Sequence, residues 1–101
     1  MSPNKNYISG RAFEYKRKKH WEAQGYDVIR ASGSHGPFDL VALCSGNPTL
    51  AIQCKRCEKL SEAKRLLAEF KKNPPLAPNT FFHQLMEVYV KETKELLTQK
   101  I

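Results

Sequence analysis

The sequence predicts a small α/β domain in which one β-sheet is covered by helices. Three observations favour this class: a length of 101 residues, apolar residues at helical spacing in two segments, and short segments rich in strand-forming residues between and after them. Their order is helix, three strands, helix, strand, helix. A chain of this length buries a single core. We therefore expect one domain over residues 1–101, with residues 1–8 as a flexible N-terminus.

Two segments have the features of longer helices. Ser9 is suited to cap a helix over residues 10–24, and Gly25 is suited to the left-handed position that closes it. A second helix is predicted over residues 60–73, followed by Pro74 and Pro75, which cannot continue it. Its apolar residues recur at helical spacing: Leu60, Ala63, Leu66, Leu67 and Phe70.

The strand predictions rest on residue type and on turn signals. Residues 38–44 and 49–55 are separated by the turn-forming run Ser45-Gly46-Asn47-Pro48, so we expect a hairpin. The complete set of predicted strands is 26–31, 38–44, 49–55 and 81–90. Residues 91–99 are predicted to form a final short helix.

The charge of the chain favours a polyanionic partner. The formal net charge is +7, from 17 basic and 10 acidic residues. Residues 1–56 carry nine basic and four acidic side chains, whereas residues 57–101 carry eight and six. Such an excess commonly attracts nucleic acid. A basic surface that serves only solubility is the alternative.

Composition also argues against several classes of protein. No apolar run approaches the roughly 20 residues needed to cross a bilayer, so we expect no membrane partner. The first residues lack the pattern of a secretory signal. Three cysteines, an odd number, fit reduced thiols better than a disulfide scaffold. We therefore expect a cytoplasmic protein, in the host cytoplasm if the chain is encoded by a virus.

Three polar residues in the predicted hairpin suggest a functional site. Gln53 and Lys55 share one face of their strand, because side chains alternate along a strand. Asp39 joins that face only if cross-strand partners have residue numbers with an even sum, and a sum of 92 places it opposite Gln53. The turn permits either register, so this is a condition on the site.

The residue types of this group indicate a hydrolytic chemistry. Carboxylate, amide and backbone carbonyl oxygens are hard ligands that suit Mg²⁺ or Mn²⁺. Such an ion activates a phosphoryl oxygen and a water, and a nearby ammonium orients the water or stabilises developing charge. The combination is a means of hydrolysing a phosphodiester.

Four short runs resemble a known family. They are Gly10-Arg11-Ala12-Phe13-Glu14, Arg30-Ala31-Ser32-Gly33-Ser34, Phe38-Asp39-Leu40-Val41-Ala42 and Ile52-Gln53-Cys54-Lys55. In this order and spacing they resemble the archaeal-type Holliday junction resolvases of the PD-(D/E)XK nuclease superfamily. The resemblance implies a restriction-endonuclease-like fold, a mixed β-sheet flanked by α-helices. It also implies a Mg²⁺-dependent endonuclease, with Mn²⁺ as a substitute, that acts as a homodimer and resolves four-way DNA junctions by paired symmetric nicks.

The resemblance also implies roles for single residues. Asp39 would be the central metal ligand, Glu14 would support the metal directly or through water, and Lys55 would be the motif lysine. Gln53 stands where the family usually has Glu, and the backbone carbonyl of Cys54 would complete the inner ligands. The residues expected to contact DNA are Arg11, Lys18, Lys19, Arg30, Ser32, Ser34 and Arg56.

Several alternatives remain open at this level. Gln53 removes a negative charge from the site, which either tunes or weakens metal binding. Glu14 could instead pair with Lys18 on an exposed helix face. Phe70 fits the core, although the family's use of this helix for dimerisation makes it a candidate interface residue. Cys54 and Cys57 form a C-x-x-C pair that suggests zinc or redox chemistry.

Two other functions fit the same residues. One is a different branched-DNA or flap nuclease on the same scaffold, because the core motif does not encode the shape of the substrate. The other is a basic DNA-binding module without catalysis.

Overall fold

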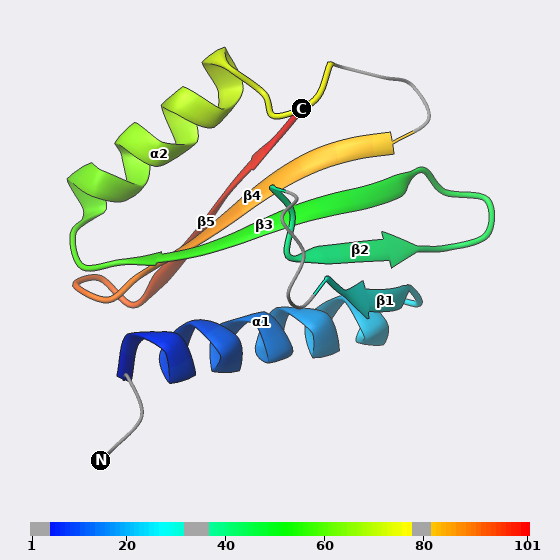
Figure 1. The fold of residues 1–101 in the computed structure, drawn as a ribbon, viewed down its shortest axis with the longest axis horizontal. Helices are drawn as coiled ribbons and strands as arrows, with labels where there is room; N and C mark the ends of the chain where they lie inside the picture. Colours follow the sequence, from blue (N-terminus) through cyan, green and yellow to red (C-terminus); the bar gives the residue numbers. More distant parts are fainter. Residues whose placement is uncertain (1–4, 32–36, 78–81) are drawn as a thin grey trace.

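Five strands form one mixed sheet in the computed structural model, and two helices cover its opposite faces (Figure 1). The structure describes residues 5–31, 37–77 and 82–101, with side chains from residue 10 onward. The strand order is β1-β2-β3-β4-β5; β3 and β4 are parallel, and the other neighbours are antiparallel. The predicted α/β class is confirmed. The elements are α1 (Lys5–Ala23), β1 (Asp27–Arg30), β2 (Leu40–Leu43), β3 (Thr49–Cys57), α2 (Leu60–Lys72), β4 (Phe82–Val90) and β5 (Glu95–Lys100).

Each face of the sheet has its own apolar cluster, because side chains alternate along β3 and β4. Phe13 of α1 packs on the face that carries Ile52 and Cys54. Phe70 of α2 packs on the opposite face with Met86. As a result, β4 is buried on both faces, and it carries two buried polar side chains, Gln84 and Glu87, among its apolar residues.

The first helix ends as expected but begins earlier. Gly25 has φ of 96°, and the amide of Tyr26 donates to the carbonyl of Trp21 while the amide of Gly25 donates to that of Glu22, the pattern of a Schellman cap. The helix begins at Lys5, so the predicted cap at Ser9 and the predicted start at residue 10 are wrong. Each added helical residue gains a backbone hydrogen bond, and this outweighs a local preference for capping.

The predicted final helix is wrong, because residues 95–100 form β5 against β4. A turn reverses the chain, with Lys94 at φ of 58° and its amide donating to the carbonyl of Val90. Without β5, one edge of the buried strand β4 would expose unpaired amide and carbonyl groups. Leu97 also packs onto the cluster beneath α2. Tertiary pairing therefore overrides the helical propensity of this segment.

A buried ion pair attaches α1 to the sheet. Both carboxylate oxygens of Glu87 accept hydrogen bonds from Arg17, each at 2.9 Å, and the indole N–H of Trp21 donates to the same carboxylate at 3.3 Å. Glu87 is 1% exposed. Arg17 is thus the partner of a buried charge on β4.

Neither helix in the described ranges is long and apolar enough to cross a membrane.

Replacing Glu87 by Gln should lower the free energy of unfolding by about 3 kcal/mol, because Arg17 would keep a partly buried charge without its counter-ion. Urea denaturation measures this change. Glu95→Gln, at an exposed position on β5, is the matched control and should change stability by less than about 0.5 kcal/mol. Equal denaturation midpoints for the two variants would contradict a structural role for the pair.

Candidate functional site

The register between β2 and β3 meets the condition stated for the polar group. Leu40 pairs with Ile52, and Val41 with Ala51, so partner numbers sum to 92. The regular pairing ends at Leu40, because the amide of the preceding residue, Asp39, donates to the carbonyl of the Leu40 partner Ile52 at 2.9 Å. Asp39 thus lies next to the Ile52–Gln53 segment of β3, and alternation places Gln53 on the face that it shares with Lys55.

The carboxylate of Asp39 closes the ladder at the point where β2 begins. Its Oδ2 accepts a hydrogen bond from the backbone amide of Cys54 at 2.8 Å. Because Ile52 uses its carbonyl toward β2, the amide and carbonyl of Cys54 point to the same side. The carbonyl oxygen of Cys54 thus lies beside the Asp39 carboxylate, where β2 supplies no backbone partner.

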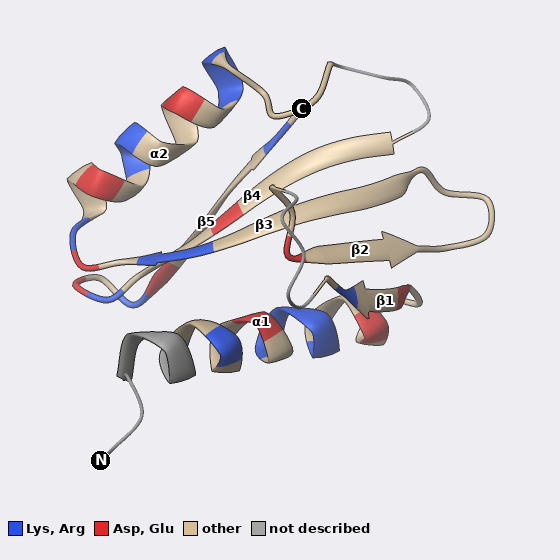
Figure 2. Ribbon diagram, in the orientation of Figure 1, with Lys and Arg blue, Asp and Glu red and all other residues tan. Residues whose placement is uncertain are grey.

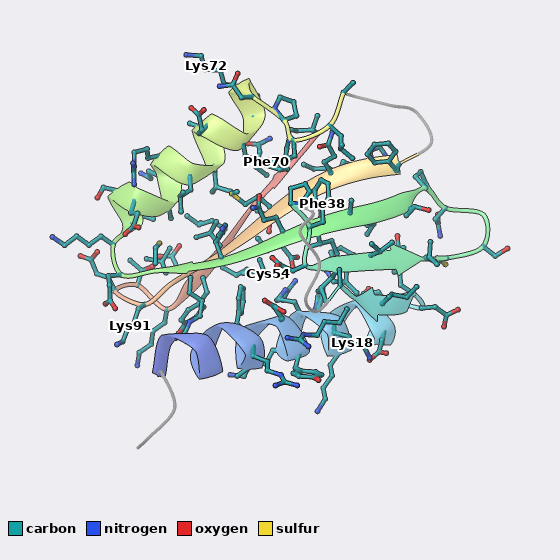
Figure 3. All side chains as sticks on the ribbon, viewed as in Figure 1. Lys18, Phe38, Cys54, Phe70, Lys72 and Lys91 are labelled. Atoms are coloured by element: carbon teal, nitrogen blue, oxygen red, sulfur yellow. The ribbon has the colours of Figure 1, made fainter. Side chains whose placement is uncertain are left out.

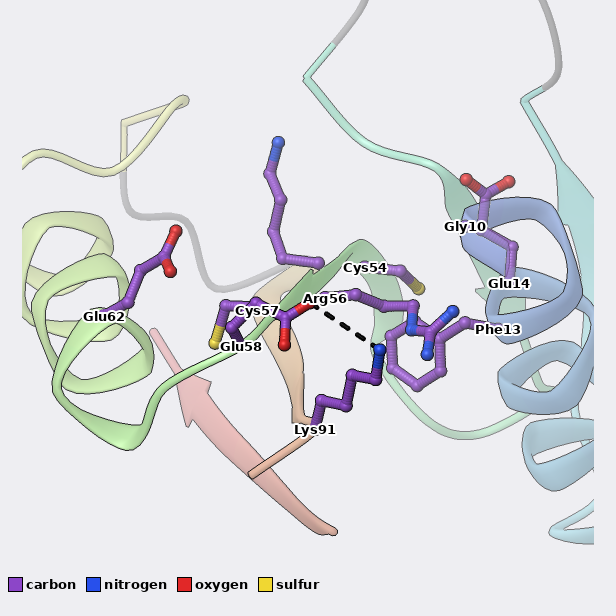
Figure 4. Close-up of a pocket in the computed structure, with 10 residues that line it drawn as sticks. Gly10, Phe13, Glu14, Cys54, Arg56, Cys57, Glu58, Glu62 and Lys91 are labelled. Atoms are coloured by element: carbon purple, nitrogen blue, oxygen red, sulfur yellow. Dashed lines mark ion pairs between the residues drawn. The ribbon is translucent and has the colours of Figure 1, made fainter. Parts of the chain in front are cut away.

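A groove of about 490 Å³ follows from the different lengths of the two strands. β3 continues to Cys57, while its partner β2 starts at Leu40, which pairs with Ile52. The free edge of β3 and the first half of α1 bound the groove on one side, and Glu62 of α2 lies on the other (Figure 4). Its lining residues are Gly10, Phe13, Glu14, Cys54, Lys55, Arg56, Cys57, Glu58, Glu62 and Lys91.

The groove collects some of the predicted site residues directly and others through a neighbour. Glu14, Cys54 and Lys55 line it, and Lys55 is exposed there. Asp39 is linked to the groove through its hydrogen bond to Cys54. Gln53 is half-buried and does not line the groove; it directly follows Ile52, whose carbonyl accepts a hydrogen bond from the Asp39 amide.

Glu14 and Arg30, both predicted site residues, are paired with each other. Arg30 Nε donates to Glu14 Oε1 at 3.0 Å, and both side chains are partly exposed. The alternative pairing of Glu14 with Lys18 is wrong, because Lys18 contacts Glu22 at 2.9 Å. The pair holds the Glu14 carboxylate at the edge of the groove and fixes β1 to α1.

A cluster of positive charge surrounds Tyr15 next to this pair. The guanidinium groups of Arg30 and Arg11 lie 5.1 Å and 5.8 Å from the centre of its ring. A hydrogen bond from Arg11, together with the charges of Arg11 and Arg30, lowers the pKa of the Tyr15 hydroxyl. The outer side of α1 therefore favours an anion near this tyrosine.

The oxygen donors beside the groove suit a hard divalent cation. Asp39 offers a carboxylate, Gln53 an amide oxygen and Cys54 a backbone carbonyl, which are the donors that Mg²⁺ and Mn²⁺ prefer. Within the described part of the chain, no three His, Cys, Asp or Glu side chains gather closely enough to hold a metal ion. Any cation would thus depend on the amide and the carbonyl as well as on Asp39.

Among the predicted DNA contacts, Arg11, Lys18 and Lys19 lie on α1, Arg30 lies on β1 and Arg56 lies near the end of β3 (Figure 2). Arg11 and Lys19 are exposed on α1, and Lys18 projects outward although it is paired with Glu22 (Figure 3). Arg56 is exposed on β3. Ser32 and Ser34 lie outside the described residues.

The three cysteines do not form the suggested zinc or redox site. Cys54 packs in the cluster beneath α1 and Cys57 in the cluster beneath α2, so the two thiols point to opposite faces of the sheet. All three cysteines are free. Burial, and then the nearby carboxylates of Glu87 and Asp39, raise the pKa of Cys54.

Phe70 serves the core of its own chain. It is 3% exposed and points from α2 toward the sheet (Figure 3). A dimer contact through α2 would therefore have to use the outward-facing neighbours of Phe70 rather than its ring.

Comparison with known proteins identifies the fold. No protein-family model and no curated protein matches the sequence. The structure is similar to a solved structure of Hjc, a Holliday junction resolvase from the archaeal hyperthermophile Archaeoglobus fulgidus, with a TM-score of 0.53 and 22% sequence identity. The match covers 81% of this chain and 65% of that chain. The likeness establishes the restriction-endonuclease-like fold, and this chain spans about two thirds of the length of its neighbour.

The thiols should differ in reactivity. Cys44 is half-buried and should react first with Ellman's reagent in the folded protein, whereas buried Cys54 and Cys57 should react only on unfolding. The Cys44→Ser variant is the control, and it should lose the fast phase. A fast phase that persists in this variant would contradict the assignment.

Stability should also depend on alkaline pH. The raised pKa of Cys54 keeps its thiol protonated where an ordinary thiol ionises, above about pH 8.5. The unfolded chain then binds fewer protons than the folded chain, so the free energy of unfolding should fall as the pH rises through this range. Urea denaturation of the wild type and of Cys54→Ala between pH 7 and 10 measures this slope, which should be shallower in the variant.

Proposed function

We propose that this chain is a metal-dependent, structure-selective DNA endonuclease that resolves four-way junctions by paired symmetric nicks. The observation that carries the proposal is the arrangement at the start of β2. There the Asp39 carboxylate is fixed to the amide of Cys54, which lines the same groove as Lys55. The fold shared with a Holliday junction resolvase supports the same reading.

In this proposal Asp39, Gln53 and the Cys54 carbonyl hold Mg²⁺, and Glu14 supports it directly or through water. When bound, the cation supplies Lewis-acid activation of a phosphoryl oxygen and of the attacking water. Mn²⁺ should substitute, since it accepts the same oxygen donors. The neutral amide of Gln53 gives less Coulombic attraction than the carboxylate it replaces, so weak metal binding is expected.

The remaining groups act on the substrate. The exposed ammonium of Lys55 orients the attacking water or stabilises the charge that develops on phosphate. Arg30 keeps the Glu14 carboxylate at the groove through their 3.0 Å ion pair. The basic residues Arg11, Lys18, Lys19 and Arg56, together with Ser32 and Ser34, contact the sugar-phosphate backbone, which positions DNA without reading its sequence.

Paired nicks on opposite strands require two active sites, so we propose a homodimer. With its ring used inside one chain, Phe70 contributes to such an interface only by shaping α2. The exposed residues of α2 are the candidates for direct contact.

The direct test is cleavage of a fluorescently labelled four-way junction, followed on a denaturing gel with Mg²⁺ and with chelator. Symmetric nicks that require the metal support the proposal. Preferential cutting of flaps or linear duplex would instead indicate a different nuclease on this scaffold. Salt-sensitive binding without cutting of any substrate would indicate a non-catalytic DNA-binding module.

The Asp39→Asn variant should bind the junction but nick it about a thousandfold more slowly, because the missing negative charge removes several kcal/mol of metal-dependent stabilisation. The substituted amide oxygen can still accept from Cys54, so the fold should persist. Asp27→Asn, at an exposed position on β1, is the matched control and should cleave like the wild type. Undiminished cleavage by folded Asp39→Asn would rule out this site.

The Gln53→Glu variant should keep its activity and reach half-maximal rate at a lower Mg²⁺ concentration, since a second carboxylate strengthens attraction for the cation. A Mg²⁺ titration of the nicking rate measures the shift. Gln24→Glu, which makes the same charge change at the exposed end of α1, should leave the titration unchanged. Complete loss of activity in Gln53→Glu would contradict the role given to this position.

A further inference from the structure

A second groove, of about 400 Å³, lies on the α1 face of the sheet. Its floor is a row of three cross-strand neighbours: Tyr89 of β4 pairs with Arg56 of β3 on one side and with Leu96 of β5 on the other. Lys16 of α1 forms part of its wall. None of the predicted catalytic residues lines this groove.

The row combines a cation with an apolar surface. The Arg56 guanidinium lies 5.5 Å from the centre of the Tyr89 ring, and Phe13 supports that ring from 6.0 Å. Leu96 is 37% exposed, although it is a large apolar residue. A planar aromatic ligand placed here gains both stacking and apolar contact.

The charged side chains that line the second groove are all basic. No Asp or Glu is among its described lining residues, whereas Glu14, Glu58 and Glu62 line the first groove. Arg17 also lines the second groove, but its charge is matched by Glu87 at 2.9 Å. Among the described residues, neither Lys16 nor Arg56 forms an ion pair, so their charges are available to an anion.

We propose that this groove binds an unpaired stretch of a DNA strand, with phosphates at Lys16 and Arg56 and bases against Tyr89 and Leu96. Cations beside an aromatic platform are the usual means of holding single-stranded nucleic acid. In a duplex the base faces are stacked on one another and are not available to contact Tyr89 and Leu96. An acidic peptide would pair with Lys16 and Arg56, but its carboxylates would make no stacking or apolar contact with Tyr89 and Leu96.

The proposal deepens the proposed function and rests on it for its biological meaning. The two grooves share the lining residues Phe13 and Arg56. In this proposal, a DNA strand bound in the first groove therefore continues into the second. The second groove would then favour DNA in which bases next to the cleaved phosphate are unpaired, as at a branch point.

Binding of a short fluorescent oligothymidylate, measured by anisotropy in the presence of chelator, tests the groove without cleavage. Arg56→Gln should weaken binding about tenfold, because it removes stacking and charge together. Lys16→Gln should weaken it less and lower the salt slope by about 0.7, the value for one phosphate contact on a single strand. Arg56→Lys, which keeps the charge without the planar group, should fall between wild type and Arg56→Gln.

Lys64→Gln is the matched control, because it removes one exposed charge from α2 on the other face of the sheet. Its affinity should stay within about twofold of the wild type. An equal loss in Lys64→Gln and Arg56→Gln would overturn the proposal, as would equal competition by a duplex or by oligoglutamate.

The oligothymidylate-binding experiment and the junction-cleavage assay test different claims. Loss of oligonucleotide binding in the Arg56 and Lys16 variants supports the groove even if the wild type nicks no junction. Conversely, a protein that nicks junctions while these variants bind single strands like the wild type retains the nuclease function and loses this groove. Both substituted side chains are exposed, and thermal denaturation verifies that the variants fold.

Discussion

The candidate site depends on the register between β2 and β3 more than on any other feature. A shift of one residue would turn Asp39 to the opposite face of the sheet from Gln53 and Lys55. The hydrogen bond from the Cys54 amide to the Asp39 carboxylate fixes the register at the end of the ladder. The same bond stops backbone pairing there, so the edge of β3 beyond Ile52 is left for the groove. One polar contact thus positions the Asp39 carboxylate beside Cys54 and leaves the edge of β3 next to it without a backbone partner.

The buried ion pair between Arg17 and Glu87 has a comparable influence on α1. Glu87 is the neighbour of Cys54 across β3 and β4, and Arg17 follows Glu14 by one turn of α1. The pair therefore locks the helix to the sheet at the level of the candidate site. A buried charge is costly when its partner is removed, so the position of α1 is strongly specified. The Glu14–Arg30 pair adds a second, more exposed attachment to β1.

Charge separates the two grooves that meet at Phe13 and Arg56. Three carboxylates, those of Glu14, Glu58 and Glu62, line the first groove, whereas the described lining of the second contains cations, an aromatic ring and an exposed leucine. In the two proposals above, the first groove serves the chemistry and the second binds the DNA strand. Strand binding also gives a reason for the exposure of Leu96, which would otherwise be an isolated apolar residue on the outer strand.

Much of the fold was determined by local signals in the sequence. The spacing of Leu60, Ala63 and Phe70 predicted α2, Gly25 predicted the end of α1, and alternation predicted which residues of β3 share a face. The polar group was also visible, because Asp39, Gln53 and Lys55 interrupt an apolar hairpin. Each of these signals depends on residues within a few positions of one another.

Only the tertiary structure decided the features that join distant segments. It fixed the register sum of 92, paired Arg17 with Glu87, and converted residues 95–100 from a predicted helix into the strand that covers the edge of β4. It also placed Arg56, Tyr89 and Leu96 in one row, although they lie far apart in the chain. Such contacts follow from the burial of charges and the pairing of strand edges. Local sequence sets the propensity of each segment, but the partner that satisfies a buried group is chosen by the whole fold.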